Sequence, residues 1–449
     1  MCTVRGSDGL YFHISPDGLP AYTKRWRYAG DFRDGVAVVQ SDSGYSTHIG
    51  LDGELIHNVW YVDLDVFHKG FARARDGDGW MHVNLQGLPT YEKRFQSVEA
   101  FYNGQARVER FDGALEVVDE SGSVKNELRP AIRSEFACLS GDMVGFWRTE
   151  TIGAAVKLGV FEVLPASCEE VAGASGLHRE RLLRLLRALG ELKLVERDGD
   201  IWACTARGEF LRADHPMTLA DAALEYADYF SGMWKRLSDA MQKENAQWSI
   251  PDVFGDVAKD QSRCFGHHRM LRSYARHDYE FVRSELHLLG NEHVIDVGGG
   301  LGVLAQLIVE QHPSTTVSIL ERPEVATLIS EKGSEVQVIA GDMFKPWKVK
   351  ADVVLLARVL HDWDDVAAKK ILMQARASLS SGGRIFIVEM LLSEHSVAGS
   401  LCDLHLLMVT GGRERTADDF EKLLGSTGFE LREIRNLPAL PSVIEASAI

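Results

Sequence analysis

Residues 291–303 read N-E-H-V-I-D-V-G-G-G-L-G-V, and this stretch decides the fold of the C-terminal half of the chain. A short apolar segment runs into three glycines at alternate positions, and an amphipathic helix pattern follows. Glycines at such a turn let the backbone adopt positive φ and approach a ligand closely. A dinucleotide fingerprint, G-x-G-x-x-G, would require glycine at position 303, where Val303 stands. The stretch therefore predicts a strand, turn and helix that bind a nucleoside rather than a dinucleotide.

Four more apolar segments follow this turn, and each ends in polar or aromatic residues. They are 317–321, ending in Glu321; 336–344, ending in Asp342, Met343 and Phe344; 352–363, ending in His361, Asp362 and Trp363; and 382–389, ending in Glu389. In open α/β sheets ligands bind outside the carboxyl ends of the strands, so these side chains should meet in one crevice. An acid after the second strand suits ribose hydroxyls. A polar acceptor beside apolar side chains suits an adenine ring.

Five motifs in this region identify a family. They are D-V-G-G-G-L-G, G-D-M-F, L-H-D-W-D-D, the acid after the fifth strand, and G-G-R-E-R-T at 411–416. The region resembles class I S-adenosylmethionine-dependent methyltransferases, and residues 128–449 together resemble O-methyltransferases of the plant-caffeate and bacterial-antibiotic type. This resemblance implies a doubly wound, Rossmann-like α/β methyltransferase sheet with S-adenosyl-L-methionine as co-substrate. The cofactor-binding residues that it implies are Asp296, Gly298, Gly300, Glu321, Asp342, Met343, Phe344 and Arg358.

His361 is the candidate catalytic residue. A phenol with a pKa near 10 is mostly protonated at neutral pH, so its methylation needs a general base, and histidine titrates in the working range. By the same resemblance, Glu389 and Glu414 flank the imidazole, orient it and stabilise its charged form. The structural alternative is a strand-end histidine that packs beside Trp363. Because His361 occurs together with the glycine turn and the other motifs, we favour catalysis.

The acids of H-D-W-D-D and of the segment 403–405 offer a second interpretation, as ligands of a catalytic magnesium ion. The motifs match the metal-independent type of enzyme instead. We therefore expect no metal in the site and activity that survives a chelator.

The middle of the chain, residues 127–255, has helical periodicity and the pattern of a winged helix-turn-helix. Ser167 and Glu170 form a predicted capping box, Gly176 separates two short helices, and residues 193–203 resemble a small wing. The second helix carries an apolar face and four arginines, Arg179, Arg181, Arg184 and Arg187. DNA readout would use those arginines. The acidic chain disfavours it, and the resemblance implies a dimerisation domain that forms a homodimer and caps the substrate pocket of the partner.

Residues 1–126 repeat with a period of 34 or 35 residues. The glycines of one series end the motif H-x-x-x-D-G or a related sequence, and those of a second series lie within the motif F-x-x-G-x-A. The two series are Gly18, Gly53, Gly87 and Gly122, and Gly35, Gly70 and Gly104. Alternating apolar residues between Asp-Gly and Asn-Gly turns predict an all-β repeat domain, which resembles WG repeats. Three aligned histidines, His13, His48 and His82, suggest either a metal site or one shared packing role, and we favour packing.

Composition limits the remaining possibilities. The 449 residues include 49 basic and 65 acidic side chains, for a net charge of −16, which disfavours nucleic acid as a partner. Six scattered cysteines form no C-x-x-C pair, and neither a signal peptide nor an apolar run long enough to span a bilayer is evident. We expect a cytoplasmic protein that binds neither nucleic acid nor membrane.

The sequence thus predicts three domains: 1–126, a β-repeat domain; 127–255, a winged-helix dimerisation domain; and 256–449, the cofactor-binding catalytic domain. The favoured function is O-methylation of a phenolic or enolic hydroxyl on a secondary metabolite. One alternative is methylation of a peptide- or carrier-bound hydroxyl or carboxylate recognised by the repeats, and another is a non-catalytic regulator that senses S-adenosylmethionine. By analogy with the family, seven residues could line the substrate pocket, and the alternative is that they are plain core residues. They are Phe230, Met233, Trp234, His267, Met270, Leu404 and Met408.

Overall fold

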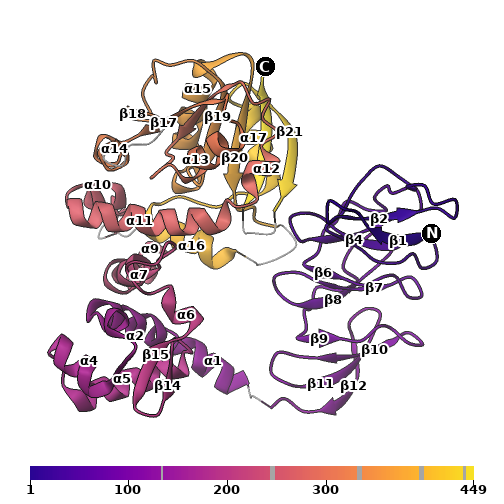
Figure 1. Ribbon diagram of the computed structural model, residues 1–449, viewed down its shortest axis with the longest axis horizontal. Coiled ribbons are helices and arrows are strands. Elements are labelled where there is room, and N and C mark those ends of the chain that lie inside the picture. The colour runs from indigo at the N-terminus through magenta and orange to yellow at the C-terminus, as the bar shows by residue number, and fades with distance from the viewer. Residues whose placement is uncertain (133–134, 243–247, 331–335, 394–398, 438–440) are drawn as a thin grey trace. The chain divides into compact units, whose positions relative to one another are not determined.

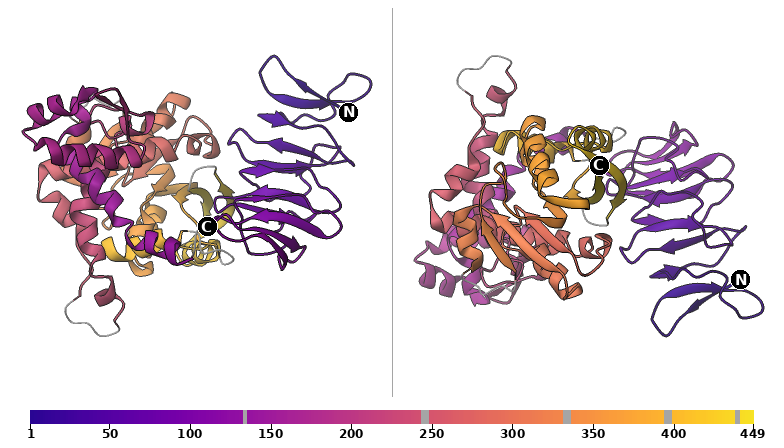
Figure 2. Two further views of the ribbon diagram at one scale, coloured as in Figure 1. Left: turned by 90° about the horizontal axis from the view of Figure 1, so that it is seen from below. Right: turned by 90° about the horizontal axis from the view of Figure 1, so that it is seen from above.

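The computed structural model contains two compact units, residues 1–144 and 145–449, each with its own hydrophobic clusters (Figures 1 and 2). The structure describes every residue of the chain except 133–134, 243–247, 331–335, 394–398 and 438–440.

The N-terminal unit is a series of short antiparallel sheets followed by one helix (Figure 2). The turns D-G, K-G and N-G at 34–35, 69–70 and 103–104 have positive φ at both residues, the geometry of two-residue hairpin turns. The sheets are β1–β2, β3–β4–β5, β6–β7–β8 and β9–β10–β11–β12. The elements are β1 (Cys2–Arg5), β2 (Tyr11–Ile14), β3 (Tyr28–Ala29), β4 (Ala37–Gln40), β5 (Ser46–Ile49), β6 (Asp63–Leu64), β7 (Ala72–Arg75), β8 (Trp80–Val83), β9 (Ser97–Val98), β10 (Gln105–Glu109), β11 (Leu115–Asp119), β12 (Val124–Arg129) and α1 (Glu135–Met143).

The three aligned histidines of this unit have one packing role, as predicted. Each ring is fully buried and donates its Nε2–H to a backbone carbonyl 17 residues later, at Gly30, Asp65 and Glu99 respectively. Each Nδ1 accepts a hydrogen bond from the side chain nine residues later, which is Tyr22, His57 or Tyr91. Because both ring nitrogens have hydrogen-bond partners, these histidines pair the polar groups buried inside each repeat.

The second unit begins with a small helical region that contains a three-stranded wing. Its core includes Leu182, Leu186 and Leu189, whereas the four arginines of the same helix are exposed. The predicted capping box at Ser167 and Glu170 is present. The elements are α2 (Phe146–Lys157), α3 (Val160–Val163), β13 (Ala166–Ser167), α4 (Cys168–Ser175), α5 (Arg179–Glu191), β14 (Val195–Asp198), β15 (Ile201–Cys204) and α6 (Ala206–Glu209).

Helical segments connect this region to the main sheet. They are α7 (Ala220–Leu224), the π-helix η1 (Glu225–Phe230), α8 (Ser231–Trp234), α9 (Leu237–Ala240), α10 (Val253–Ala258), α11 (Gln261–Asp278) and α12 (Val282–Glu285).

The main sheet of the described chain has seven strands in the order β18–β17–β16–β19–β20–β22–β21, with β22 antiparallel to both neighbours (Figure 1). The strand order reverses between β16 and β19, and a crevice opens at such a switch point. The elements are β16 (His293–Val297), α13 (Val303–Gln311), β17 (Thr316–Glu321), α14 (Pro323–Ser330), β18 (Gln337–Ala340), β19 (Ala351–Ala357), the 3-10 turn η2 (Leu360–Asp362), α15 (Asp365–Ser378), β20 (Leu379–Glu389), α16 (Ser400–Val409), α17 (Ala417–Gly425), β21 (Phe429–Asn436) and β22 (Ser442–Ala448).

Two hydrophobic clusters cover the two faces of this sheet. One packs α15 and α17 against it, and the other packs α12, α13 and α14. Both faces are buried, which explains why the parallel strands are continuous apolar runs. The predicted α/β fold, the helical winged domain and the N-terminal β-region are therefore confirmed. Among the described residues, no helix has the length and apolar character needed to cross a membrane.

Candidate active site

The glycine turn after β16 has the predicted backbone conformation. Gly298, Gly300 and Gly302 have φ values of 69°, 55° and 78°, in the region that favours glycine. A Cβ on Gly298 would lie 2.9 Å from a methyl group of Val359, so the loop packs closely under the strand end of β19. The amide of Gly300 donates a 3.0 Å hydrogen bond to Glu321 at the end of β17. The turn and the first acid of the site are thus joined directly.

A cavity of about 430 Å³ opens beside this turn, at the switch point of the sheet. Seven of the eight predicted cofactor residues line it, namely Gly298, Gly300, Glu321, Asp342, Met343, Phe344 and Arg358. The eighth, Asp296, is buried beneath the turn, where a Cβ on Gly299 would meet its carboxylate at 2.5 Å.

The charges of this cavity suit a cationic nucleoside. Both carboxylate oxygens of Asp296 are buried without a hydrogen-bond partner among the described residues. Burial, and then the nearby charge of Glu321, raise the pKa of Asp296 to about 7. Burial also raises the pKa of Glu321 to about 7, against the hydrogen bonds that its carboxylate accepts from the amides of Arg322 and Gly300. A positive charge nearby would stabilise the ionised form of these two buried acids. The sulfonium and ammonium groups of S-adenosylmethionine would supply such a charge.

Aromatic side chains also line the cavity. Trp363 stacks on Phe254 at 5.6 Å between centroids and meets Phe344 edge-on at 4.8 Å. Such a cluster beside Asp342 fits an adenine ring. Sequence reasoning had assigned Phe344 but missed Phe254, because an aromatic residue on α10 carries no local motif that marks a ligand.

His361 lies in η2, buried among charged groups. Its Nδ1 faces Glu414 at 3.5 Å and Glu389 at 3.8 Å, and its Nε2 lies 3.7 Å from Asp362. Burial alone would lower the pKa of His361, but Glu389 and then Asp362 outweigh it, so its pKa lies above the ordinary value. The structure thus brings together the three residues predicted to be catalytic, and a proton on the imidazole is stabilised by the surrounding acids.

Arg358 occupies the space between the two glutamates. Its guanidinium donates hydrogen bonds to Glu389 at 3.3 Å and to Glu414 at 3.2 Å. Burial would raise the pKa of Glu414, but the hydrogen bond to His361 and the charge of Arg358 hold it below the ordinary value. Burial raises the pKa of Glu389 despite the same cations. Arg358 also lines the cavity beside the glycine turn, as Asp362 does, so both residues connect that cavity to the histidine.

The other carboxylate oxygen of Glu389 accepts hydrogen bonds from the backbone, a role that the sequence did not indicate. Its Oε1 accepts hydrogen bonds from the amides of Val359, Leu360 and His361, at 3.0, 2.9 and 3.3 Å. Glu389 therefore holds the turn that carries the histidine, as well as facing its ring.

The acids considered as metal ligands have other partners in this structure. Asp364 caps α15, Asp365 pairs with Arg415, and Asp403 accepts the amide of Glu414. His361, Glu389 and Glu414 have donor atoms within 4.8 Å of one another, a spacing that a cation could bridge. The guanidinium of Arg358 already provides a positive charge to both carboxylates.

The residues proposed for the substrate pocket divide into two groups. Phe230 and Trp234 contact His405, with the indole Nε1–H of Trp234 donating to its Nδ1 at 3.0 Å, and Tyr226 stacks on the same imidazole. His267 lines the cofactor cavity. Met270 and Met408 are 3% and 1% exposed and belong to the core. Phe230 is 4% exposed and also belongs to a core cluster, so the core interpretation holds for Phe230, Met270 and Met408.

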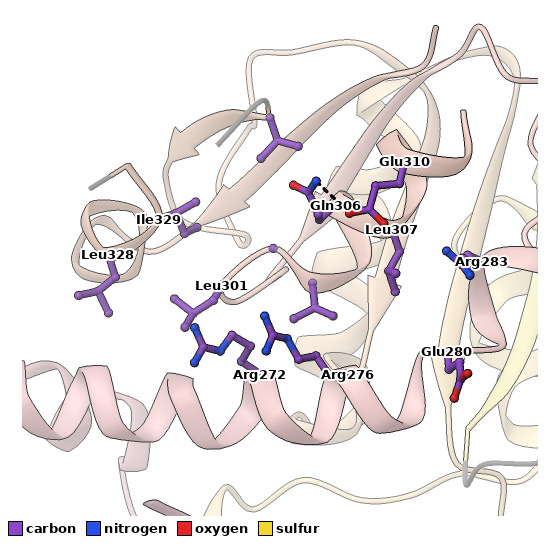
Figure 3. Close-up of a pocket in the computed structure, with 13 residues that line it drawn as sticks. Arg272, Arg276, Glu280, Arg283, Leu301, Gln306, Leu307, Glu310, Leu328 and Ile329 are labelled. Atoms are coloured by element: carbon purple, nitrogen blue, oxygen red, sulfur yellow. Dashed lines mark hydrogen bonds between the residues drawn. The ribbon is translucent and has the colours of Figure 1, made fainter. Parts of the chain in front are cut away.

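A larger cavity lies elsewhere in the described chain. It measures about 600 Å³ between α11, α13 and α14, where Arg272 and Arg276 reach from α11 towards Leu301 (Figure 3). Of the turn glycines, it includes only Gly302, and no predicted site residue lines it. Size therefore does not identify the site here, whereas the convergence of strand ends does.

The sheet order, the glycine turn and the acid-lined cavity define a class I methyltransferase. A family model of the O-methyltransferase domain matches residues 234–430, and one of the O-methyltransferase dimerisation domain matches residues 142–214. The mitomycin biosynthesis 6-O-methyltransferase of Streptomyces lavendulae is 30% identical over 310 residues, which cover 66% of this chain and 88% of that enzyme.

Solved structures agree. The crystal structure of LaPhzM matches with a TM-score of 0.66 at 26% identity and covers 71% of this chain and 100% of its own. Human N-acetylserotonin methyltransferase, solved with S-adenosylmethionine, shares the fold with a TM-score of 0.65 at 24% identity, over 71% of this chain and 99% of that one. The chain belongs to the family of S-adenosylmethionine-dependent O-methyltransferases. It is an enzyme, which overturns the alternative of a non-catalytic sensor.

Proposed function

We propose that this enzyme methylates a phenolic or enolic hydroxyl of a small aromatic secondary metabolite, with His361 as the general base. One observation carries the proposal. Arg358 and Asp362 both line the cofactor cavity and both flank His361, so the histidine lies at the edge of the space that holds the methyl donor.

The donor supplies an electrophilic methyl group on a cationic sulfur when it is bound. Glu321 would accept the ribose hydroxyls, Asp342 and Phe344 would contact the adenine, and the turn at Gly298 and Gly300 would leave room for the amino-acid portion. The buried carboxylate of Asp296 would balance the positive charge from beneath the turn.

His361 would then remove the proton of the acceptor. Its Nδ1 faces Glu414 and Glu389, so Nε2, which lies 3.7 Å from Asp362, would provide the lone pair for the acceptor hydroxyl. As the O–H proton moves to Nε2, the acceptor oxygen forms its bond to the methyl carbon and the carbon–sulfur bond breaks. The resulting imidazolium is stabilised by the two glutamates. General-base assistance of this kind contributes about 10²–10⁴-fold.

The aromatic cluster of Tyr226, Trp234 and His405, which packs against the buried ring of Phe230, supports an aromatic acceptor. His405 lies about one turn of α16 after Cys402, which contacts Glu414 at 3.6 Å, and Glu414 in turn faces His361. Relatives named for phenazine, 3-amino-4-hydroxybenzoate and naphthoate methylation act on flat ring systems. Flat aromatic rings stack on such a wall.

The family comparison supports a proposal about oligomeric state, and the charge of Arg358 supports one about the need for a metal ion. The dimerisation-domain match at 142–214 supports a homodimer formed through the predicted domain 127–255 of a cytoplasmic enzyme. Arg358, as the cation between Glu389 and Glu414, supports transfer without a metal.

A second candidate is an acceptor bound to a peptide or carrier. The N-terminal unit favours it, because both family models lie within residues 142–430 and neither includes residues 1–126, the predicted WG-like repeats. Repeat arrays present extended surfaces to large partners.

One experiment separates the two candidates. The full chain and a variant lacking residues 1–126 are incubated with S-adenosylmethionine and two sets of acceptors, followed by mass spectrometry. The first set contains free hydroxynaphthoates and aminohydroxybenzoates, and the second contains the same rings on carrier proteins. We expect both proteins to methylate the free acids. Methylation of the carrier-bound set alone, and only by the full chain, would favour the second candidate.

A further inference from the structure

Arg415 is the largest of the fully buried side chains, and the proposed chemistry has not used it. Only 1% of its surface is exposed. Its guanidinium donates to the carbonyls of Leu360 and Trp363, both at 2.8 Å, and to the carboxylate of Asp365 at 2.9 and 3.0 Å. Leu360 and Trp363 are the residues on either side of the pair His361–Asp362. A buried guanidinium therefore holds both ends of the turn that carries the base.

The neighbours of Arg415 grip the same turn. The amide of Arg413 donates to the carbonyl of His361 at 2.8 Å, and Glu414 faces its ring. A Cβ on Gly412 would lie 2.0 Å from the carbonyl of His361, so only glycine permits this approach. The segment 412–415 thus packs residue by residue along the segment 360–363.

This pairing of segments gives a structural role to residues from two sequence motifs. Asp365 belongs to L-H-D-W-D-D and Arg415 to G-G-R-E-R-T, and the two form an ion pair. Glu389 satisfies the amides of the turn and Arg415 its carbonyls, so the backbone on either side of His361 is fixed by two charged side chains. Burying an arginine is costly unless it is fully paired, and here it is paired with three acceptors.

We propose that Arg415 is a positioning residue for catalysis, which holds the turn of His361 so that the imidazole stays between its acids and the methyl donor. The inference rests on the proposed role of His361 as the base. Loss of the guanidinium would leave the carbonyl of Trp363 without a partner among the described residues and the carbonyl of Leu360 with only a 3.3 Å bond from the amide of Trp363, and the turn would relax. A displacement of about 1 Å in a catalytic group costs on the order of 10²-fold in rate.

The proposal also predicts a change in the titration of His361. The charged and titratable groups around the imidazole are Glu389 on β20, Cys402 and His405 on α16, Glu414 after that helix, Asp362 on the same turn, and Arg358 after β19. A turn that moves away from Glu389 and Glu414 weakens the interactions that raise the pKa of His361. The pKa of His361 should therefore fall, and the rise of kcat with pH should begin at lower pH.

The test compares Arg415→Met, Arg415→Lys and Asp365→Asn with Arg384→Met and His361→Ala in the full chain. Arg384 is a matched control, since it also bonds a carbonyl and carboxylates but lies in the middle of β20, where its partners are His287, Glu445 and Glu292. The measurements are kcat and KM with a hydroxynaphthoate acceptor, thermal unfolding, and the NMR titration of His361 in histidine-labelled protein, assigned by its loss in His361→Ala. The titration needs no acceptor.

We expect Arg415→Met to lower kcat by on the order of 10²-fold with the KM for S-adenosylmethionine nearly unchanged, and to shift the His361 titration to lower pH. Arg415→Lys should restore part of both, and Asp365→Asn should show smaller changes in the same direction. Arg384→Met should lower the unfolding temperature and leave kcat and the titration unchanged. Folded Arg415→Met with an unchanged titration overturns the inference. If Arg415→Met does not fold, an unchanged titration in both Arg415→Lys and Asp365→Asn overturns it. Full turnover by His361→Ala would overturn the base itself.

Discussion

The two units of this chain both bury histidines, and they use them in opposite ways. In the repeats, His48 and His82 have only neutral hydrogen-bond partners, and burial lowers the pKa of each to about 4. In the catalytic unit, His361 is just as enclosed but lies among acids that raise its pKa. Burial therefore does not decide what a histidine does. The charge and completeness of its hydrogen-bond partners decide it.

The same contrast holds for carboxylates. Asp296 and one oxygen of Glu414 are buried without partners among the described residues, and both belong to the candidate site. Buried polar atoms are normally paired, so an exception requires an explanation, and a charged ligand that arrives later provides one.

Replacing His361 by alanine should have the largest effect. We expect kcat to fall by about 10²–10⁴-fold while the affinity for S-adenosylmethionine changes little, because the proton acceptor is lost and the cavity is not. Turnover assays and calorimetry provide the two values. A large loss of affinity with little loss of kcat would place His361 in the binding site instead.

Glu321 should control how cofactor affinity depends on pH. Its pKa is raised to about 7, so the carboxyl group is protonated below that pH and ionised above it. We expect the affinity for S-adenosylmethionine to increase as pH rises from 6 to 8, and Glu321→Gln to weaken it by about 10–100-fold and flatten this dependence. Calorimetric titration at several pH values measures how the affinity for S-adenosylmethionine depends on pH in both proteins. An unchanged dependence in the variant would assign it to another group.

His82→Ala is the counterpart of His361→Ala in the repeats. It removes the partners of Tyr91 and of the Glu99 carbonyl, so the free energy of unfolding should fall by about 1–3 kcal/mol with turnover of free acceptors unchanged. Denaturant unfolding and the turnover assay report the two quantities. Reduced turnover in a stable variant would contradict the purely structural role.

A chelator should have the smallest effect. Because Arg358 already neutralises Glu389 and Glu414, we expect EDTA to leave kcat unchanged, and added magnesium to have no effect. Loss of activity that magnesium restores would reverse this prediction.

The sequence predicted the strand-turn-helix at 291–303, the acids at the strand ends and the period of the repeats. These features depend on local chemistry: glycine conformation, apolar periodicity and turn residues act over a few neighbouring positions. The placement of His361 beside Glu389 and Glu414 also followed, but only through the resemblance of ordered motifs to a family.

Only the tertiary structure decided which charges meet. Arg358 was assigned to the cofactor, yet its guanidinium also lies between two glutamates, and Arg415 reaches across to the turn of His361. Phe254 joins Trp363 from a separate helix. No local pattern specifies such pairs, because they depend on how long-range packing brings strand ends and helices together. The sequence by itself determined the elements and the chemistry available at their ends, and the packing determined which groups are paired, which stay unpaired, and hence which can act.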